Sequence, residues 1–226
     1  DLPKTMRDAV TTCRRLSIRY LWIDALWIIQ GQEGDFPHEA ARMKAIYSGC
    51  IFTIAAADSK NPHGGCFRDR SPLCLSDCLV FQGEEHAIFI KSSVKRCGVM
   101  GNGGTPGECV LDKRAWVFQE RMLSPRTLYF GHDNIHFECC EGLICAKAPE
   151  CKEGRTCHAH RDFSLKFIFL TLITLDAHPL TDSLHTFQQM WRRILRYYSE
   201  TALSHQEGRL SAIAGVVSAL QDNLRL

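Results

Sequence analysis

The sequence predicts an α/β fold built around a parallel sheet. Two apolar runs, residues 20–23 and 51–57, are too short for buried helices and are rich in aromatic and β-branched side chains, which is typical of strands buried on both faces. The segment between them carries apolar residues at helical spacing. A strand, a helix and a strand in this order form a βαβ unit, whose strands lie parallel with a right-handed crossover. Ligands of such sheets bind beyond the carboxyl ends of the strands, and Asp24 follows the first strand.

Two amphipathic helices are predicted in the N-terminal half. At the start of the first helix, Asp1 can act as a cap and Pro3 suits the first turn. Its apolar side consists of Leu2, Met6, Ala9, Val10, Cys13 and Leu16. The second helix is the crossover of the βαβ unit, with Asp35 as its cap and Pro37 in its first turn. Its inward side consists of Phe36, Ala40, Met43 and Tyr47.

Residues 58–110 are predicted to form an irregular insertion within the domain. The segment is rich in glycine, proline, serine and cysteine and contains the run GNGGTPGE. One hairpin is expected inside it, between residues 79–81 and 87–90.

Regular structure is predicted again from residue 114 onward. Residues 114–123 favour a short helix stopped by Pro125, and residues 127–130 and 135–139 favour strands around a turn. A loop rich in cysteine and histidine follows. The chain then ends in two helices, near residues 183–203 and 210–220. The inward side of the first of these is predicted to be Leu184, Phe187, Trp191, Ile194, Leu195 and Tyr198.

Composition and charge narrow the functional classes. A chain of 226 residues can bury one sizeable core, or a core plus a small lobe. The net charge is only +2, and no long basic run interleaved with aromatics marks a nucleic-acid surface, so nucleic acid is not expected as a partner. The most apolar segment, residues 167–175, is too short to cross a bilayer, and no membrane association is expected. The 12 cysteines are irregularly spaced, which favours reduced thiols and a cytoplasmic location.

Three blocks of the sequence carry a family resemblance. The first comprises LPKTMRDAV, RYLWID, IIQ and EAARMKAIYS; the second is RAWVFQERMLSPRTLYFG; the third is WRRILRYYSETALS followed by RLSAIAGV. In this order the blocks resemble the fungal heterokaryon-incompatibility (HET) domain. The resemblance implies a role in fungal non-self recognition (allorecognition) and programmed cell death. It also suggests that residues 1–162 form the HET domain and that residues 163–226 form a helical extension packed on it.

The resemblance further implies a strand ahead of the first helix, which this sequence does not contain. In a flavodoxin-like strand order, that strand would lie between residues 20–23 and 51–57. A strand buried on both faces contributes about 1.5–3 kcal/mol for each large apolar side chain. Residues 1–226 alone are therefore expected to be aggregation-prone and inactive.

The order of elements is similar to that of Toll/interleukin-receptor (TIR) domains. A helix, a strand ending in aspartate, a capped helix, a strand and a helix that starts near a tryptophan are shared with that flavodoxin-like fold, which has a parallel sheet with helices on both faces. Enzymatic TIR domains carry a W-C-x-x-E pattern on this last helix, and its glutamate serves NAD cleavage. The comparable residues here are Trp116 and Glu120, whose spacing leaves both on one helical face.

The TIR-like resemblance implies NAD as a substrate rather than a bound cofactor. Cleavage of the nicotinamide–ribose bond passes through an oxocarbenium-like transition state, which the carboxylate of Glu120 would stabilise as the catalytic residue. Trp116 could stack on the leaving ring. The pyrophosphate could be bound by arginines near the helix, namely Arg114, Arg121 and Arg126.

Two further residues are candidates for the substrate site. Asp24 could contact a ribose hydroxyl, or it could cap the turn that follows its strand. Gln30 matches the family and could serve either the site or the loop. The structural alternative for the helix is that Trp116 belongs to the core and Glu120 pairs with an arginine at the surface.

The cysteine-rich loop allows other chemistries. Its soft ligands could form a tetrahedral zinc site, but only Cys140 and Cys145 are closely spaced, so no metal is expected. The remaining candidate ligands are Cys151, Cys157, His158 and His160. A cysteine nucleophile is the least favoured alternative, since no glycine-rich oxyanion motif accompanies the thiols.

A second functional class fits the same sequence. The chain could be a non-enzymatic signalling module whose helices bind partner proteins or self-associate. The discriminating observation is whether Glu120, Trp116 and Asp24 converge on one site, or whether Glu120 points into solvent.

Overall fold

A computed structural model gives the fold of the chain. It describes residues 1–29, 34, 36–90, 111–132, 134–140, 142–146, 165–174, 180–203 and 208–224. Four predictions fall outside these residues: the cap at Asp35, the placement of Gln30, residues 91–110 of the predicted insertion, and the part of the cysteine-rich loop from residue 147 to 164.

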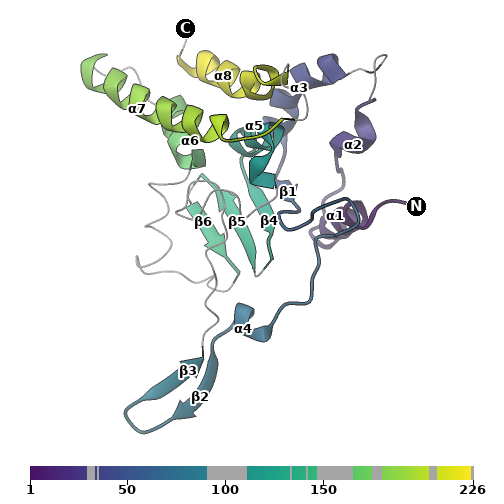
Figure 1. The fold of residues 1–226 in the computed structure, drawn as a ribbon, viewed down its shortest axis with the longest axis vertical. Helices are drawn as coiled ribbons and strands as arrows, with labels where there is room; N and C mark the ends of the chain where they lie inside the picture. Colours follow the sequence, from purple (N-terminus) through teal and green to yellow (C-terminus); the bar gives the residue numbers. More distant parts are fainter. Residues whose placement is uncertain are drawn as a thin grey trace.

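The fold is mixed α/β, with a four-stranded sheet in the order β1-β4-β5-β6 (Figure 1). The strands are β1 (Thr53–Ala55), β4 (Thr127–Phe130), β5 (Ile135–Cys139) and β6 (Gly142–Cys145). Strand β1 pairs with β4 in parallel, whereas β4–β5 and β5–β6 are antiparallel. The strands predicted at residues 127–130 and 135–139 are confirmed. Strand β6 was not predicted, because its residues were assigned to the cysteine-rich loop.

The strand predicted at residues 20–23 is not formed. This segment has no regular structure and is followed by a short helix, α2 (Asp24–Trp27). Tyr20 is 82% exposed, and Trp22 instead packs edge-on against Tyr47, with ring centroids 5.7 Å apart. A strand needs a neighbour to satisfy its backbone hydrogen bonds, and no described strand lies beside this segment. The parallel pair is formed by β1 and β4 instead, and the β1 strand is shorter than the predicted 51–57.

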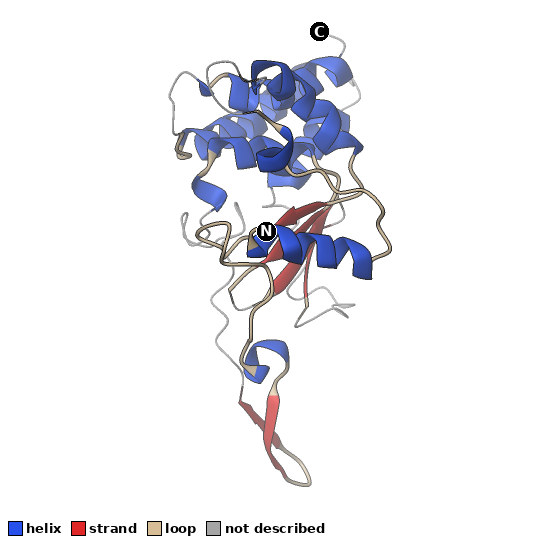
Figure 2. Ribbon diagram, turned by 90° about the vertical axis from the view of Figure 1, so that its right-hand side faces the viewer, coloured by secondary structure: helices blue, strands red, loops and turns tan. Residues whose placement is uncertain are grey.

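Most of the hydrophobic core lies among the helices rather than against the sheet. The helices are α3 (Phe36–Gly49), α5 (Ala115–Leu123), α6 (Leu165–Thr174), α7 (Leu180–Ser199) and α8 (Ser211–Leu224). They gather on one side of the sheet (Figure 2), with α5 in contact with α3, α6 and α8. Three side chains at the centre of this core, Phe118, Leu172 and Val216, are fully buried.

The predicted helical faces are confirmed in part. In the first helix Ala9 and Cys13 are buried, but Leu2 and Leu16 are 42% and 53% exposed. In α3, Met43 and Tyr47 are buried as expected. In α7, Ile194 and Tyr198 are buried, but Leu195 is 40% exposed. None of the helices in the described part of the chain combines the length and apolar character needed to cross a membrane.

Helix α1 (Lys4–Arg15) lies away from the other helices, at the β1 side of the sheet (Figures 1 and 2). Its buried face is partly polar, because Asp8 and Thr12 are buried together with Ala9 and Cys13. No side-chain cap is formed at its start, where Pro3 precedes the first helical residue. The helix is therefore attached by hydrogen bonds as well as by apolar contacts.

The predicted hairpin is confirmed as β2 (Cys78–Gln82) and β3 (Ala87–Ile90). It follows the short helix α4 (Pro72–Leu75) and projects away from the body of the protein (Figure 1). All of its strand residues are exposed, including six large apolar side chains: Leu79, Val80, Phe81, Ile88, Phe89 and Ile90.

A polar layer separates the sheet from the helices. Arg121 of α5 forms a bidentate ion pair with Glu138 of β5, with N–O distances of 2.9 and 2.7 Å, and both side chains are buried. The hydroxyl of Tyr129 donates to the same carboxylate at 2.7 Å. Lys166 of α6 donates to Thr127 Oγ1 at 3.1 Å. This side of the sheet is thus held by charge-assisted hydrogen bonds.

Candidate functional site

Glu120 lies where three helices meet. Helix α5 follows the short 3₁₀ turn η1 (Leu111–Lys113) and begins after Arg114, whose backbone is extended. Along α5, Arg121 faces the polar layer over the sheet, whereas its neighbour Glu120 faces α3 and α2. The hydroxyl of Tyr47 from α3 donates a hydrogen bond to Glu120, and the charge of Asp24 from α2 acts on both residues. We call Glu120, Asp24, Tyr47 and Arg114 the acidic cluster.

The environment of the acidic cluster changes how Glu120 ionises. Burial raises its pKa most, the negative charge of Asp24 raises it further, and Arg114 and the Tyr47 hydrogen bond lower it, with a net pKa of about 7. Burial and the negative charges of Glu120 and Asp24 likewise raise the pKa of Tyr47, so this phenol stays protonated as a donor. A carboxyl with a pKa near neutrality, beside a second carboxylate, is typical of sites that perform acid–base chemistry.

Trp22 packs beside the acidic cluster, against Tyr47. It is partly buried against the edge of the Tyr47 ring. Its indole nitrogen is buried and has no hydrogen-bond partner among the described residues. Buried polar atoms are nearly always paired in native proteins, so this unpaired donor beside Tyr47 is unusual.

Only some of the predicted site residues lie together in the structure. Asp24 and Glu120 are partly buried and close enough for their charges to interact, and Arg114 joins them. Trp116 is partly buried and packs against the helical core. Arg126 is exposed and donates to the carbonyl of Ile51 at 3.3 Å.

Arg121 is buried and paired inside the protein. Its guanidinium is bound on Glu138 in the polar layer, so it faces the sheet and not the acidic cluster. Tyr47 was predicted only as an inward residue of the second helix. Its position at Glu120 depends on how α3 packs against α5, which helical periodicity does not specify.

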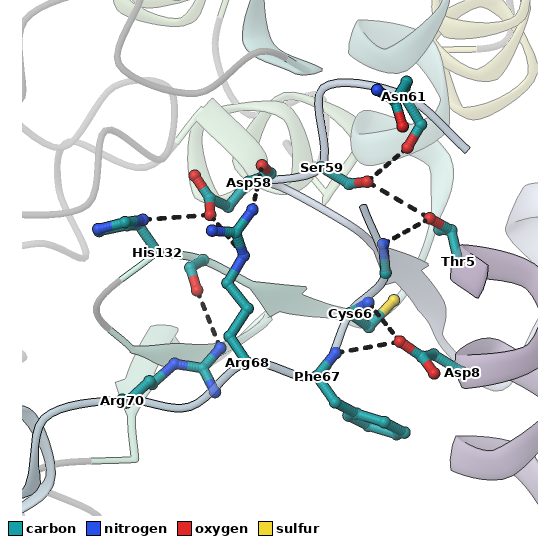
Figure 3. Close-up of polar contacts among 12 residues, drawn as sticks. Thr5, Asp8, Asp58, Ser59, Asn61, Cys66, Phe67, Arg68, Arg70 and His132 are labelled. Atoms are coloured by element: carbon teal, nitrogen blue, oxygen red, sulfur yellow. Dashed lines mark hydrogen bonds and ion pairs between the residues drawn. The ribbon is translucent and has the colours of Figure 1, made fainter. Parts of the chain in front are cut away.

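A second polar cluster lies at the carboxyl ends of the parallel strands (Figure 3). Asp58 follows β1, and its Oδ2 accepts from Arg68 Nε at 2.8 Å and lies 3.2 Å from His132 Nδ1. Arg70 donates to the carbonyl of Gly131 at 2.9 Å. The sequence patterns pointed to none of Asp58, Arg68 and Arg70 as site residues, and to His132 only as a partner for a cysteine nucleophile. The rule that selected Asp24, that ligands bind beyond the carboxyl ends of parallel strands, also applies to Asp58, which follows the apolar run 51–57.

The same loop is fastened to helix α1 through Asp8 (Figure 3). Its Oδ2 accepts from the backbone nitrogens of Cys66 and Phe67 at 2.7 and 3.2 Å, and Lys4 lies 3.3 Å away. Burial alone would raise the pKa of Asp8, but these two hydrogen bonds and Lys4 lower it overall. Gly65 stands at the turn, with a φ of 79° that residues with a side chain rarely adopt.

We expect Gly65→Ala to lower the free energy of unfolding by about 2–3 kcal/mol. The new methyl group would need a left-handed backbone and would lie 2.6 Å from Asp8 Oδ2, which cannot move without losing its two backbone partners. Gly49→Ala is the matched control, since a methyl group there meets nothing within 4 Å. Urea unfolding of both variants measures the difference, and equal stabilities would contradict the proposed fastening of the loop.

Ionisation of Glu120 is expected to destabilise the fold as the pH rises. Its pKa is about 7 in the folded chain against an ordinary value of 4.5, so the folded state binds this proton more tightly than the unfolded state. The stabilisation is complete below pH 4.5 and is lost as the pH rises through 7. Urea unfolding at pH 5 and pH 8 should show that wild type loses about 1–3 kcal/mol more than Glu120→Gln. Parallel pH dependences would mean that Glu120 is solvated.

The described residues contain no group of three or more potential metal ligands. Cys139 and Cys140 are free thiols on β5 and just after it. Cys151, Cys157, His158 and His160 lie outside the described residues. The expectation that no metal binds in this loop stays a prediction.

The described residues thus define a mixed α/β protein with an acidic cluster between its helices. A family model described as heterokaryon incompatibility protein (HET) matches residues 1–120, more than half of the chain. The chain therefore belongs to the HET family, as the sequence blocks predicted. No curated protein and no solved structure gave a significant match.

Proposed function

We propose that this HET-family chain acts in the cytoplasm in fungal non-self recognition and programmed cell death, and that it does so by cleaving NAD at the acidic cluster. The observation that carries the proposal is the convergence of Glu120 and Asp24, from helices far apart in sequence, around the hydroxyl of Tyr47. Two carboxyl groups that share a site are the arrangement by which proteins cleave glycosidic bonds.

The proposed reaction assigns a task to each residue. The electron pair of the N-glycosidic bond leaves with nicotinamide, and water forms the new bond at the anomeric carbon. The Glu120 carboxylate stabilises the positive charge that develops on the ribose and accepts the proton of the attacking water. Asp24 binds ribose hydroxyls, while Arg114 provides the positive charge for the pyrophosphate.

We further propose that the unit carrying the acidic cluster has a TIR-like, flavodoxin-like arrangement. It is supported by the connection from β1 through α5 to the parallel strand β4, with Glu120 on the helix that precedes β4. In this reading the antiparallel strands β5 and β6 extend the sheet beyond the unit that carries the site.

The direct test is to incubate the intact protein with NAD and to measure nicotinamide by chromatography. We expect nicotinamide and ADP-ribose to appear in equal amounts, because one bond is hydrolysed. An NAD pool that stays constant at micromolar protein, in a preparation shown to be folded, would overturn the enzymatic proposal.

A second function is favoured by a different observation, the apolar hairpin. Strands β2 and β3 expose apolar side chains on both faces, although a two-stranded hairpin is marginally stable alone in water. Exposed apolar surface of this kind marks protein interaction sites. The alternative proposal is a non-enzymatic module that uses this arm to self-associate or to bind a signalling protein.

We expect Phe81→Ser combined with Phe89→Ser to reduce self-association of the chain without reducing its stability. Both side chains are about half exposed, so their loss should change the free energy of unfolding by no more than about 0.5 kcal/mol each. Light scattering over a concentration series measures the association, and urea unfolding measures the stability. Unchanged association would remove the hairpin from this role.

A further inference from the structure

Ser17 has a backbone conformation that suits glycine. Helix α1 ends at Arg15, and the chain then reverses in a hydrogen-bonded turn. The amide of Ser17 donates to the carbonyl of Arg14 at 3.1 Å, and the amide of Ile18 donates to that of Cys13 at 2.8 Å. These two bonds form a Schellman motif, whose left-handed residue is usually glycine. Ser17 has a φ of 57° at this position, and no other non-glycine residue in the described part of the chain has a positive φ.

Stability does not explain a serine at this turn. A left-handed backbone strains any residue that has a Cβ atom, and glycine avoids this strain. The side chain of Ser17 is exposed, so it adds no packing in the core that would offset the strain. Strained residues that persist in folded proteins cluster at functional positions. The group that glycine would lose here is the hydroxyl.

The sequence around Ser17 carries a recognition pattern for protein kinases. Residues 14–18 read RRLSI, so arginines stand three and two positions before the serine and an isoleucine directly follows it. Guanidinium groups form bidentate, charge-assisted hydrogen bonds with carboxylates. Kinases that select basic substrates read such charge patterns through an acidic groove. The chain therefore presents a hydroxyl acceptor together with the charges that would bring a kinase to it.

The end of α1 can enter such a groove while the buried part of the helix stays in place. The buried residues of α1 are Asp8, Ala9, Thr12 and Cys13. All of them precede Arg14, and every residue from Arg14 to Ser17 is exposed. A kinase binds its substrate as an extended segment, so the last turn of α1 must unwind, and helix ends fray at little cost in free energy. Unwinding releases Arg15 from the ring of Phe67, whose centroid lies 5.6 Å from the guanidinium carbon.

We propose that Ser17 is a phosphorylation site for a protein kinase that selects basic substrates. The kinase transfers the γ-phosphoryl group of ATP. A bond forms between Ser17 Oγ and phosphorus, and the bond from phosphorus to the oxygen that bridges the β- and γ-phosphates breaks. Its electron pair leaves with ADP, and the hydroxyl proton passes to the carboxylate base of the kinase. The product carries negative charge in a segment with the exposed Arg14, Arg15 and Arg19. This site does not depend on the NAD chemistry proposed above.

The test is to incubate the full chain with ATP, Mg²⁺ and the catalytic subunit of cyclic-AMP-dependent protein kinase, and to locate phosphate by tandem mass spectrometry. We expect incorporation at Ser17. Replacing both Arg14 and Arg15 by glutamine should lower the initial rate at least about 10-fold, because charge-assisted contacts with the kinase are lost. Arg7→Gln combined with Arg196→Gln removes the same charge from exposed positions and should leave the rate unchanged.

Ser17→Gly removes the acceptor and keeps the turn. Glycine suits a left-handed backbone, so this variant should unfold at no lower urea concentration than wild type and should incorporate no phosphate at the turn. The proposal is overturned if the folded wild type is not phosphorylated at Ser17, or if the reaction there requires urea. It is also overturned if the double arginine variant reacts as fast as wild type, since recognition would then not depend on the two charges.

Discussion

Replacing Arg121 by methionine is expected to lower the free energy of unfolding by about 3–5 kcal/mol. Arg121 and Glu138 are 3% and 0% exposed, and the substitution leaves the carboxylate buried without its bidentate partner. Burial raises the pKa of Glu138, but the charge of Arg121 outweighs it and holds the pKa at about 2, so the group is fully ionised at neutral pH. Urea unfolding at pH 7 measures the loss.

The controls separate charge from packing. Arg196→Met breaks an ion pair with Glu200 in which both partners are exposed, and it should cost less than about 0.5 kcal/mol. The double variant Arg121→Met with Glu138→Leu should recover much of the loss, because it removes the uncompensated charge. A single variant as stable as wild type would show that Lys166, which also lowers the pKa of Glu138, compensates the carboxylate alone.

Glu120→Gln is expected to lower the rate of NAD cleavage by at least about 100-fold. The substitution keeps the shape of the side chain but removes the negative charge that would face the developing oxocarbenium ion. Stability at neutral pH should not fall, because a neutral amide avoids the cost of burying a charge beside Asp24. The measurement is nicotinamide release at saturating NAD.

Glu200→Gln is the matched control for this experiment. It makes the same chemical change at an exposed position just after α7 and should leave the rate unchanged. Equal rates for wild type and Glu120→Gln would exclude the acidic cluster as the catalytic site, even if the protein consumes NAD. Slower cleavage together with a loss of cooperative unfolding would instead show that Glu120 serves the fold.

Local patterns predicted the elements whose shape depends on nearby residues. Strands β4 and β5 and the hairpin β2–β3 were expected at nearly their observed bounds, since turn residues and alternation define them. Residues 20–23 carried an equally good strand pattern, but a strand also depends on a partner elsewhere in the chain. The aromatic side chain that suggested a buried strand, Trp22, packs on a helix instead.

The candidate site could likewise be predicted only in part. The sequence suggested that Glu120 and Asp24 could converge, and the described structure brings their charges together. The sequence could not assign Arg121 to Glu138. That pairing depends on which face of α5 covers the sheet, and the sequence alone does not specify this face. The cluster around Asp58 and Arg68 depends on the path of the inserted loop, which no periodicity encodes.

The pairing of β1 with β4 has a consequence for the order of folding. Strands β4, β5 and β6 follow one another through short turns, so they can pair early at little cost in chain entropy. Strand β1 has only three residues, and a long segment containing α4, the hairpin and α5 separates it from Thr127 and its neighbours in β4. Pairing β1 with β4 therefore closes a large loop, at a higher cost in chain entropy. Strand β1, which ends at Ala55 shortly before Asp58, should therefore dock last, and its backbone amides should exchange with solvent sooner than those of the other three strands. The carboxyl ends of the parallel pair, and with them the cluster around Asp58, would then be the last part of the molecule to become ordered.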